Sequence, residues 1–152
     1  MPQRYEAGTI NAPGIAGLGA GARWLLERGV DAVHRHGTEL AEHLIAGLAR
    51  VPGVCVFGPP PAAERTAVVS FGFSGVGPVE VSYVLDEVYG LLVRAGLHCA
   101  PDAHRSLGTL EDGGLVRVSF GPFNTAADVD RVLDAARQIA VKADGRRPDV
   151  TL

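Results

Sequence analysis

The sequence predicts an α+β domain in which helices cover a small mixed or antiparallel sheet. Two observations support this class. Helix-like and strand-like patterns follow one another in the order ααββαββα, so strands lie beside helices without regular alternation. The chain has 152 residues, of which 47% are hydrophobic, and this suits one domain with a real core. We therefore expect a single domain over residues 1–141 and a frayed tail over 142–152.

Two helices are expected in the N-terminal third of the chain. Pro13 suits a first helical position, and apolar residues recur at helical spacing until Gly29 ends this helix. The second helix is expected over Val30–Arg50, where the apolar residues again form a stripe. Pro52 and Gly53 stop it.

The middle of the chain is rich in short β-branched and aromatic runs, which indicate strands. Four strands and one intervening helix are expected: Val54–Phe57, Thr66–Phe73, the helix Pro78–Tyr89, Leu91–Arg94 and Val116–Phe120. In the first strand Cys55 alternates with valines as a small core residue would, so we expect it to be buried and unreactive.

The rest of the chain predicts one irregular segment and one helix. Residues 95–114 are expected to be irregular, with a short helix after Pro101. Thr125 is placed to cap a last helix that runs to about Val141, and Asp128 completes a pattern like a capping box.

Composition excludes several classes of function. The net charge is −3 without a basic block, which argues against a dedicated nucleic-acid-binding protein. No apolar run approaches the roughly 20 residues that span a bilayer, and the N-terminus does not read as a signal peptide. We therefore expect a cytoplasmic protein. Two cysteines do not make a disulfide framework, and one lysine, Lys142, leaves no candidate for a buried Schiff base.

The segment Arg94–Pro101 carries the clearest chemical signal. Cys99 follows an expected strand in a loop that contains glycine and proline, so the thiol is expected to be accessible. His98 precedes it and a helix is expected to begin at Pro101, and both features favour the thiolate, which is the nucleophilic form. Local chemistry alone leaves an inert loop cysteine equally open.

A metal site at this segment is disfavoured. His98, Cys99 and His104 lie near one another in sequence, but no further cysteine joins them. Structural zinc sites usually need four protein ligands and catalytic sites three. The prediction is that the chain has no metal site.

Two arginines flank the cysteine segment. Arg117 alternates with apolar residues in its strand, and Arg94 ends the strand before the cysteine. A guanidinium group binds a carboxylate through two parallel hydrogen bonds, so the pair predicts an anion-receiving site beside a thiolate. Considered singly, each arginine is also compatible with an outward-facing surface residue.

Three separated motifs resemble class V aminotransferases. Arg4–Thr9 and Pro13–Leu18 resemble the stretch that leads out of the large domain of these enzymes. Val93–Pro101 resembles the active-cysteine loop of cysteine desulfurases and selenocysteine lyases. Val116–Phe120 followed by Phe123–Thr125 resembles the carboxylate-binding strand and the start of the final helix. The resemblance covers nearly the whole chain and implies the C-terminal small domain of a pyridoxal-phosphate enzyme of fold type I.

The resemblance implies a cysteine desulfurase, which converts L-cysteine into alanine and leaves a persulfide on an enzyme cysteine. In that case Cys99 would attack the substrate sulfur, Arg117 would hold the substrate carboxylate and Arg94 would line the same pocket. Thr9 would reach the phosphate of pyridoxal phosphate in a partner subunit, because the family forms homodimers.

The resemblance also assigns roles to two histidines and to further partners. His98 would tune or relay a proton, and His104 is a weaker candidate for the same role. The implied partners are L-cysteine or selenocysteine, a sulfur-acceptor protein and the large domain that carries the cofactor. The family's Schiff-base lysine, pyridinium-pairing aspartate and ring-stacking histidine have no counterpart here, so we expect residues 1–14 to be the remnant of a connection to a missing large domain.

This departure leaves three functions open. The chain could be part of a desulfurase, in which case it would be inactive alone. It could also belong to a class V aminotransferase, which shares Arg117 but does not need Cys99. The third possibility is a non-catalytic module that accepts sulfur or binds a partner.

Overall fold

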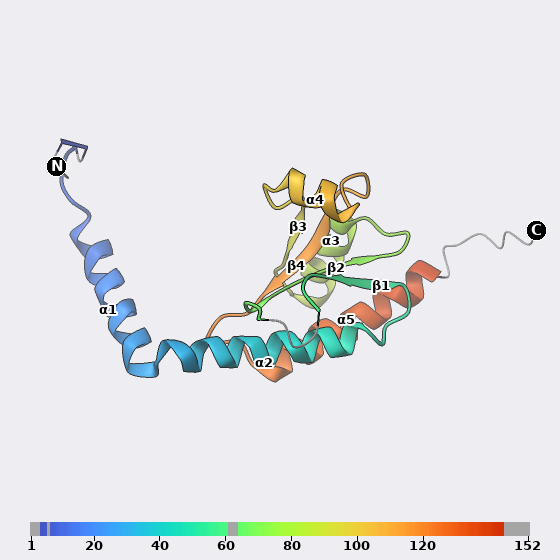
Figure 1. Ribbon diagram of the computed structural model, residues 1–152, viewed down its shortest axis with the longest axis horizontal. Coiled ribbons are helices and arrows are strands. Elements are labelled where there is room, and N and C mark those ends of the chain that lie inside the picture. Colours follow the sequence, from blue (N-terminus) through green and yellow to red (C-terminus); the bar gives the residue numbers. More distant parts are fainter. Residues whose placement is uncertain (1–3, 6, 61–63, 145–152) are drawn as a thin grey trace, which may run out of the picture. The chain divides into compact units, whose positions relative to one another are not determined.

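The computed structural model describes residues 4–5, 7–60 and 64–144 (Figure 1). In the described chain the elements are α1 (Ala12–Arg28), α2 (Val30–Leu48), β1 (Val54–Phe57), β2 (Val68–Phe73), α3 (Pro78–Tyr89), β3 (Arg94–Gly96), α4 (Pro101–Leu107), β4 (Leu115–Ser119) and α5 (Ala126–Asp144). The chain divides into two compact units, Met1–Arg35 and His36–Leu152, and the boundary lies within α2.

The first unit consists of α1 and the first turns of α2. The side chain of Asn11 accepts a hydrogen bond from the Gly14 N–H at 3.0 Å and so caps the first turn. Gly29, with a φ of +85°, ends α1, as the sequence predicts. No residue of α1 is buried in this unit. The exposed large apolar side chains of α1 are Ile15, Leu18, Leu25 and Leu26.

The second unit is built on one four-stranded sheet. The strands lie in the order β1-β2-β4-β3, and all three pairings are antiparallel. β2 and β4 are therefore central, and β1 and β3 form the edges. This arrangement confirms the predicted α+β class and shows the sheet to be antiparallel.

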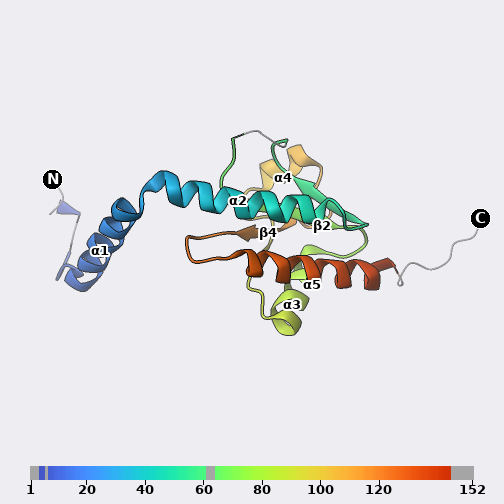
Figure 2. The same ribbon diagram turned by 90° about the horizontal axis from the view of Figure 1, so that it is seen from below.

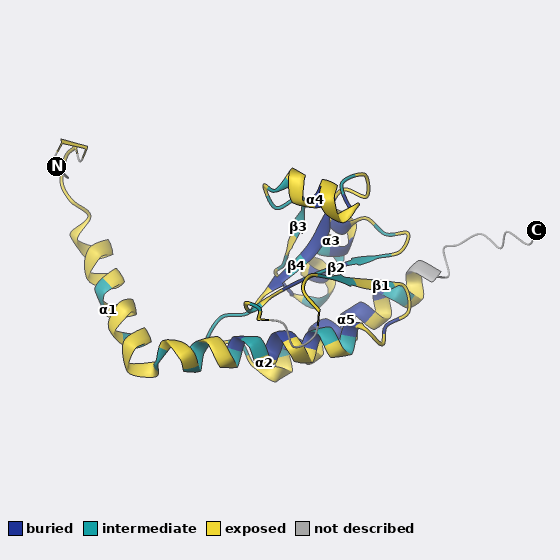
Figure 3. Ribbon diagram, viewed as in Figure 1, coloured by how far each residue is buried: buried dark blue, intermediate teal, exposed yellow. Residues whose placement is uncertain are grey.

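One face of the sheet carries the core. Val69 pairs with Val118 and Phe71 pairs with Val116, so these four side chains share a face and all are buried. Helices α2, α3 and α5 cover this face (Figure 2), and Figure 3 marks the buried segments of these helices in dark blue. The helix residues in this core include Leu40, Leu44, Leu48, Val81, Leu85, Val129, Leu133 and Ile139. Burial of this apolar surface is the main stabilising term for the unit.

The opposite face of the sheet is more polar. Phe57 pairs with Ser70, Ser70 pairs with Arg117, and Arg117 pairs with Arg94, so one row of side chains crosses all four strands. Two arginines therefore stand side by side on the face that the core does not use. The fold places both candidate anion-binding residues at one position of the sheet.

Cys55 also lies on this second face, which corrects the prediction that it is buried. It pairs with Gly72 and is exposed to solvent. The valines on either side of it, Val54 and Val56, pack against the core instead. The alternation in the sequence is real, but the period alone cannot say which of the two faces is covered.

The third strand begins later than the sequence predicts. The expected strand was Leu91–Arg94, whereas β3 spans Arg94–Gly96. Leu91 instead helps to end α3, because its N–H donates to the Leu85 carbonyl at 2.9 Å and its side chain is 8% exposed. An apolar residue after a helix C-terminus and an apolar strand residue look alike in a sequence.

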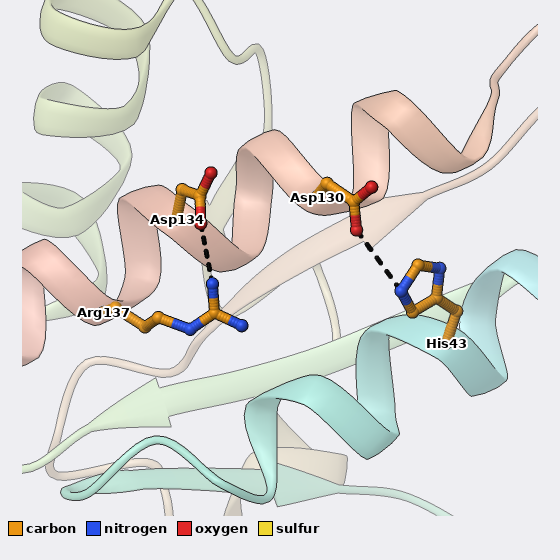
Figure 4. Close-up of polar contacts among 4 residues, drawn as sticks. All are labelled: His43, Asp130, Asp134 and Arg137. Atoms are coloured by element: carbon orange, nitrogen blue, oxygen red, sulfur yellow. Dashed lines mark hydrogen bonds and ion pairs between the residues drawn. The ribbon is translucent and has the colours of Figure 1, made fainter.

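The last helix begins as predicted. The Thr125 N–H donates to the Asp128 carboxylate at 2.9 Å, and the Asn124 side chain accepts a hydrogen bond from the Gly121 N–H at 2.8 Å. Figure 4 shows polar contacts of α5, among them the one between Asp130 and His43 of α2. The Asp130 Oδ1 and His43 Nε2 atoms are 3.3 Å apart.

None of the helices in the described part of the chain is both long and apolar enough to cross a membrane.

Candidate functional site

The loop between β3 and α4 has an unusual backbone. His98 and Cys99 are consecutive non-glycine residues with positive φ angles of 54° and 60°. Side chains rarely adopt this left-handed region, and such strain is often found at functional sites. The Ala100 N–H donates to the Leu97 carbonyl at 2.8 Å and closes the turn. The Cys99 thiol is exposed, as the sequence predicts.

Two glycines hold the base of this loop. Gly96 ends β3 with a φ of +98°, and Gly114 precedes β4 with a φ of +97°. A side chain on Gly114 would collide with the backbone carbonyl of Gly96. The two backbones therefore approach more closely than any other residue at position 114 would allow. This contact fixes where the cysteine loop leaves the sheet.

Arg94 bonds directly to the cysteine. Its Nη2 atom donates a hydrogen bond to the Cys99 sulfur at 3.1 Å. A guanidinium group keeps its charge at every physiological pH, so a sulfur anion at this position would have a permanent charged donor. The sequence predicted the two residues to lie near one another, and the structure adds the contact itself.

Arg117 lies directly opposite Arg94 on the neighbouring strand. Its side chain is half-buried, and its Nε atom is buried without a hydrogen-bond partner among the described residues. An unsatisfied buried donor is costly, and a carboxylate that accepts from Nε and a terminal nitrogen would satisfy it. Because β4 is a central strand, Arg117 is not the outward-facing edge residue that the sequence left open.

His98 completes the group. Its Nε2 atom lies 3.3 Å from the Arg94 carbonyl oxygen. Burial of the ring lowers the pKa of His98 below its ordinary value, and electrostatic interactions with Arg117, His104 and Arg94 lower it further, while the hydrogen bond to the Arg94 carbonyl opposes the shift. The balance favours an uncharged imidazole at neutral pH.

The structure brings four of the five predicted site residues together. Arg94, His98, Cys99 and Arg117 all lie in the second unit. Thr9 lies in the first unit, where it is exposed two residues before the Asn11 cap of α1. A further polar residue near the site, Thr109, is buried and bonded to His104 and was not among the predicted residues. No sequence signal marks this threonine, because the contact depends on where α4 ends.

The described residues do not form a complete site for pyridoxal phosphate. The group around Cys99 offers guanidinium, imidazole and thiol groups, but the chain's one lysine is Lys142, at the other end of the sequence near the end of α5. Binding this cofactor needs an amine for its aldehyde and groups that hold its ring. The side chains present instead suit a carboxylate and a sulfur atom.

The chain is similar to known proteins over most of its length. The family model for aminotransferase class-V matches residues 1–132. A probable cysteine desulfurase from Methanothermobacter thermautotrophicus is 33% identical over 140 residues, which are 92% of this chain and 34% of that protein. A probable cysteine desulfurase from Pseudomonas putida is 41% identical over 137 residues, which are 90% of this chain and 32% of that protein.

Solved structures give the same result. Apo cysteine desulfurase from Thermococcus onnurineus superposes with a TM-score of 0.82 at 32% identity, covering 93% of this chain and 34% of that one. The cysteine desulfurase CsdA from Escherichia coli, solved as an S-sulfonic acid, gives 0.77 at 33% identity and covers 90% of this chain and 32% of that one. The chain thus spans about a third of the length of these relatives. The resemblance inferred from three motifs is confirmed: the chain belongs to the aminotransferase class-V family.

Proposed function

We propose that this chain is the part of a pyridoxal-phosphate-dependent cysteine desulfurase that carries the sulfur-accepting cysteine. The observation that supports this most strongly is the hydrogen bond from Arg94 to the Cys99 sulfur, one strand away from the unsatisfied Nε of Arg117. A charged donor on the Cys99 sulfur suits a nucleophilic sulfur, and the free donor on Arg117 suits a substrate carboxylate. L-cysteine supplies that carboxylate and a sulfur atom for Cys99 to attack.

Each residue has a distinct role in this proposal. Arg117 binds the carboxylate of L-cysteine, which orients the substrate sulfur. Cys99 forms an S–S bond to that sulfur while the C–S bond of the substrate breaks, and the proton lost by the Cys99 thiol balances the one gained at the carbon that becomes the alanine methyl group. Arg94 then holds the persulfide on Cys99, which is an anion once the proton of the substrate thiol has passed to solvent.

The cofactor and the partners come from outside the described residues. Class V relationship implies pyridoxal phosphate, which supplies an electron sink when bound. A large domain would hold it, residues 1–14 would be the connection to that domain, and Thr9 would contact the cofactor phosphate in a homodimer. A separate acceptor protein would take the sulfur from Cys99. The exposed apolar side chains of α1, which include Leu18 and Leu26 at 75% exposure each, provide a surface for such a domain.

The contact between Arg94 and Cys99 and the unsatisfied donor of Arg117 favour this function over the two alternatives. An aminotransferase uses the carboxylate-binding arginine but has no need for a sulfur nucleophile or for a donor to it. A non-catalytic sulfur carrier needs Cys99 but has no need for the unsatisfied Arg117.

The test is sulfide release from L-cysteine by the protein that joins this chain to its cofactor-bearing domain. We expect release with pyridoxal phosphate, loss of release in Cys99→Ala, and normal release in Cys55→Ala, which removes the other exposed cysteine. The 152-residue chain alone should release none with the added cofactor. Amino-group transfer that survives Cys99→Ala would show an aminotransferase instead.

A further inference from the structure

A buried polar pair lies behind the cysteine loop. His104, in the middle of α4, is 4% exposed, and its Nδ1 atom lies 2.8 Å from the hydroxyl oxygen of Thr109, which is also 4% exposed. Burying two polar side chains is costly, and here the hydrogen bond between them offsets the cost. A core position at this depth would normally hold an apolar residue, so the pair requires an explanation.

Thr109 ties His104 to the framework of the site. The Thr109 N–H donates to the His104 carbonyl at 2.9 Å, and the Thr109 carbonyl accepts from the Gly114 N–H at 2.9 Å. Gly114 in turn lies against Gly96 at the end of β3. The imidazole of His104 is therefore linked, through Thr109 and Gly114, to the ends of both strands that carry the arginines.

His104 faces His98. The centroids of the two rings are 5.7 Å apart and the rings are tilted by 44°. The groups that act on His98 come from three elements: Arg94 from β3, Arg117 from β4 and His104 from α4. The two guanidinium groups keep their charge at every physiological pH. His104 is the one imidazole among these three groups.

The orientation of His98 fixes its tautomer. Its Nε2 atom points at the Arg94 carbonyl oxygen, and a carbonyl oxygen only accepts, so Nε2 must carry the proton. In an uncharged ring this leaves Nδ1 as the atom that can accept a proton. Arg94 also holds the Cys99 sulfur, so one residue links the orientation of His98 to the nucleophile.

We propose that His104, held in place by Thr109, is a positioning residue whose ring packs against that of His98 and keeps the His98 Nε2–H on the Arg94 carbonyl. Nδ1 of His98 is then free to accept the proton that the Cys99 thiol loses, and that proton passes on to the carbon that becomes the alanine methyl group. This inference rests on the proposed function, because it assigns His98 a use in that reaction. His104 acts through His98 and does not touch the substrate.

Nuclear magnetic resonance of the imidazole nitrogens in the 152-residue chain tests this inference without any assay of sulfur transfer. The resonances of His98 are identified with His98→Gln. In the wild type we expect the Nε2–H tautomer and a His98 pKa below its ordinary value. His104→Gln keeps a hydrogen-bonding partner for Thr109 but removes the second imidazole, and it should raise the pKa of His98 and mix its tautomers.

Two variants of Thr109 separate positioning from folding. Thr109→Val removes the hydroxyl and should raise the pKa of His98, whereas Thr109→Ser restores the hydroxyl and should restore the wild-type titration. The proposal is overturned if wild-type His98 carries its proton on Nδ1, a result that needs no variant. It is also overturned if folded His104→Gln and Thr109→Val titrate like the wild type. Failure of sulfide release would leave these readings unchanged, so the two proposals fail separately.

Discussion

The guanidinium of Arg94 and the sulfur of Cys99 are joined by a hydrogen bond of 3.1 Å. The two residues are five positions apart, and the left-handed backbone at His98 and Cys99 turns the thiol back toward the strand that carries the arginine. The contact gives the sulfur of this loop cysteine a permanently charged hydrogen-bond donor.

Loss of this donor should slow the reaction of Cys99 with iodoacetamide. In Arg94→Gln we expect alkylation of Cys99 at neutral pH to slow about threefold to fivefold, which corresponds to about 1 kcal/mol for an exposed charge-assisted hydrogen bond. Peptide mass mapping follows each thiol separately, and Cys55 in the same sample is the control. Equal slowing at both cysteines would mean that Arg94 does not act through this contact.

Replacement of Gly114 should destabilise the cysteine loop. Gly114→Ala adds a methyl group that meets the Gly96 carbonyl, and we expect it to lower the free energy of unfolding by about 2 kcal/mol or more. Gly113→Ala is a matched control, because its φ of +80° imposes similar backbone strain but its side chain would meet only Pro78 at 4.0 Å. Urea denaturation of both variants measures the difference. Equal stability of the two would contradict the close approach of β3 and β4.

The pH dependence of stability should report the cap of α5. The Thr125 N–H, with help from the side chain of Asn124, lowers the pKa of Asp128 below its ordinary value. The unfolded chain therefore binds the proton more readily, so Asp128 stabilises the fold above its unfolded pKa of about 3.9 and this contribution is lost as the pH falls through the folded value.

Asp128→Asn should therefore lower the melting temperature at neutral pH and have little effect in acid. Melting followed by circular dichroism from pH 7 to about pH 3 tests this. Asp134→Asn is the control, because Asp134 pairs with Arg137 on the exposed surface of the same helix and should change stability little at either pH. A loss at Asp128 that persists in acid would show that the carboxylate charge is not responsible.

Replacement of Arg117 should cost the fold no stability, although this residue lies in a central strand. Arg117→Met removes the buried Nε that lacks a partner and also removes the like charge opposite Arg94. We expect the free energy of unfolding of the chain to stay the same or rise by up to about 1 kcal/mol, while the KM for L-cysteine rises at least tenfold in the cofactor-bearing protein. A strong loss of stability would indicate a structural role for Arg117.

The sequence predicted the elements well and the faces of the sheet less well. Helical and strand periods, together with Pro78, Pro101 and the Thr125 cap, placed nearly every element, because these signals are local. The faces depend on which side the helices cover, and this is why Cys55 was wrongly expected to be buried. The start of β3 was misplaced because Leu91 is apolar for a different reason, the end of α3.

The candidate site was predictable where motif residues lie in one segment or at strand positions. Arg94, His98 and Cys99 are close in sequence, and Arg117 follows from an alternating strand. The pair of His104 and Thr109 and the approach of Gly96 to Gly114 were not predictable, because they depend on tertiary contacts across the loop. Such contacts have no local period or motif.

The measurement that tests the central claim most directly is the position of the persulfide. The cofactor-bearing protein is mixed with L-cysteine, thiols are trapped by alkylation, and the peptides that contain Cys55 and Cys99 are weighed. We expect one additional sulfur atom on Cys99 and none on Cys55, and a weaker signal in Arg117→Met at L-cysteine concentrations near the wild-type KM. Persulfide on neither cysteine during sustained conversion of L-cysteine, or on Cys55 alone, would contradict it.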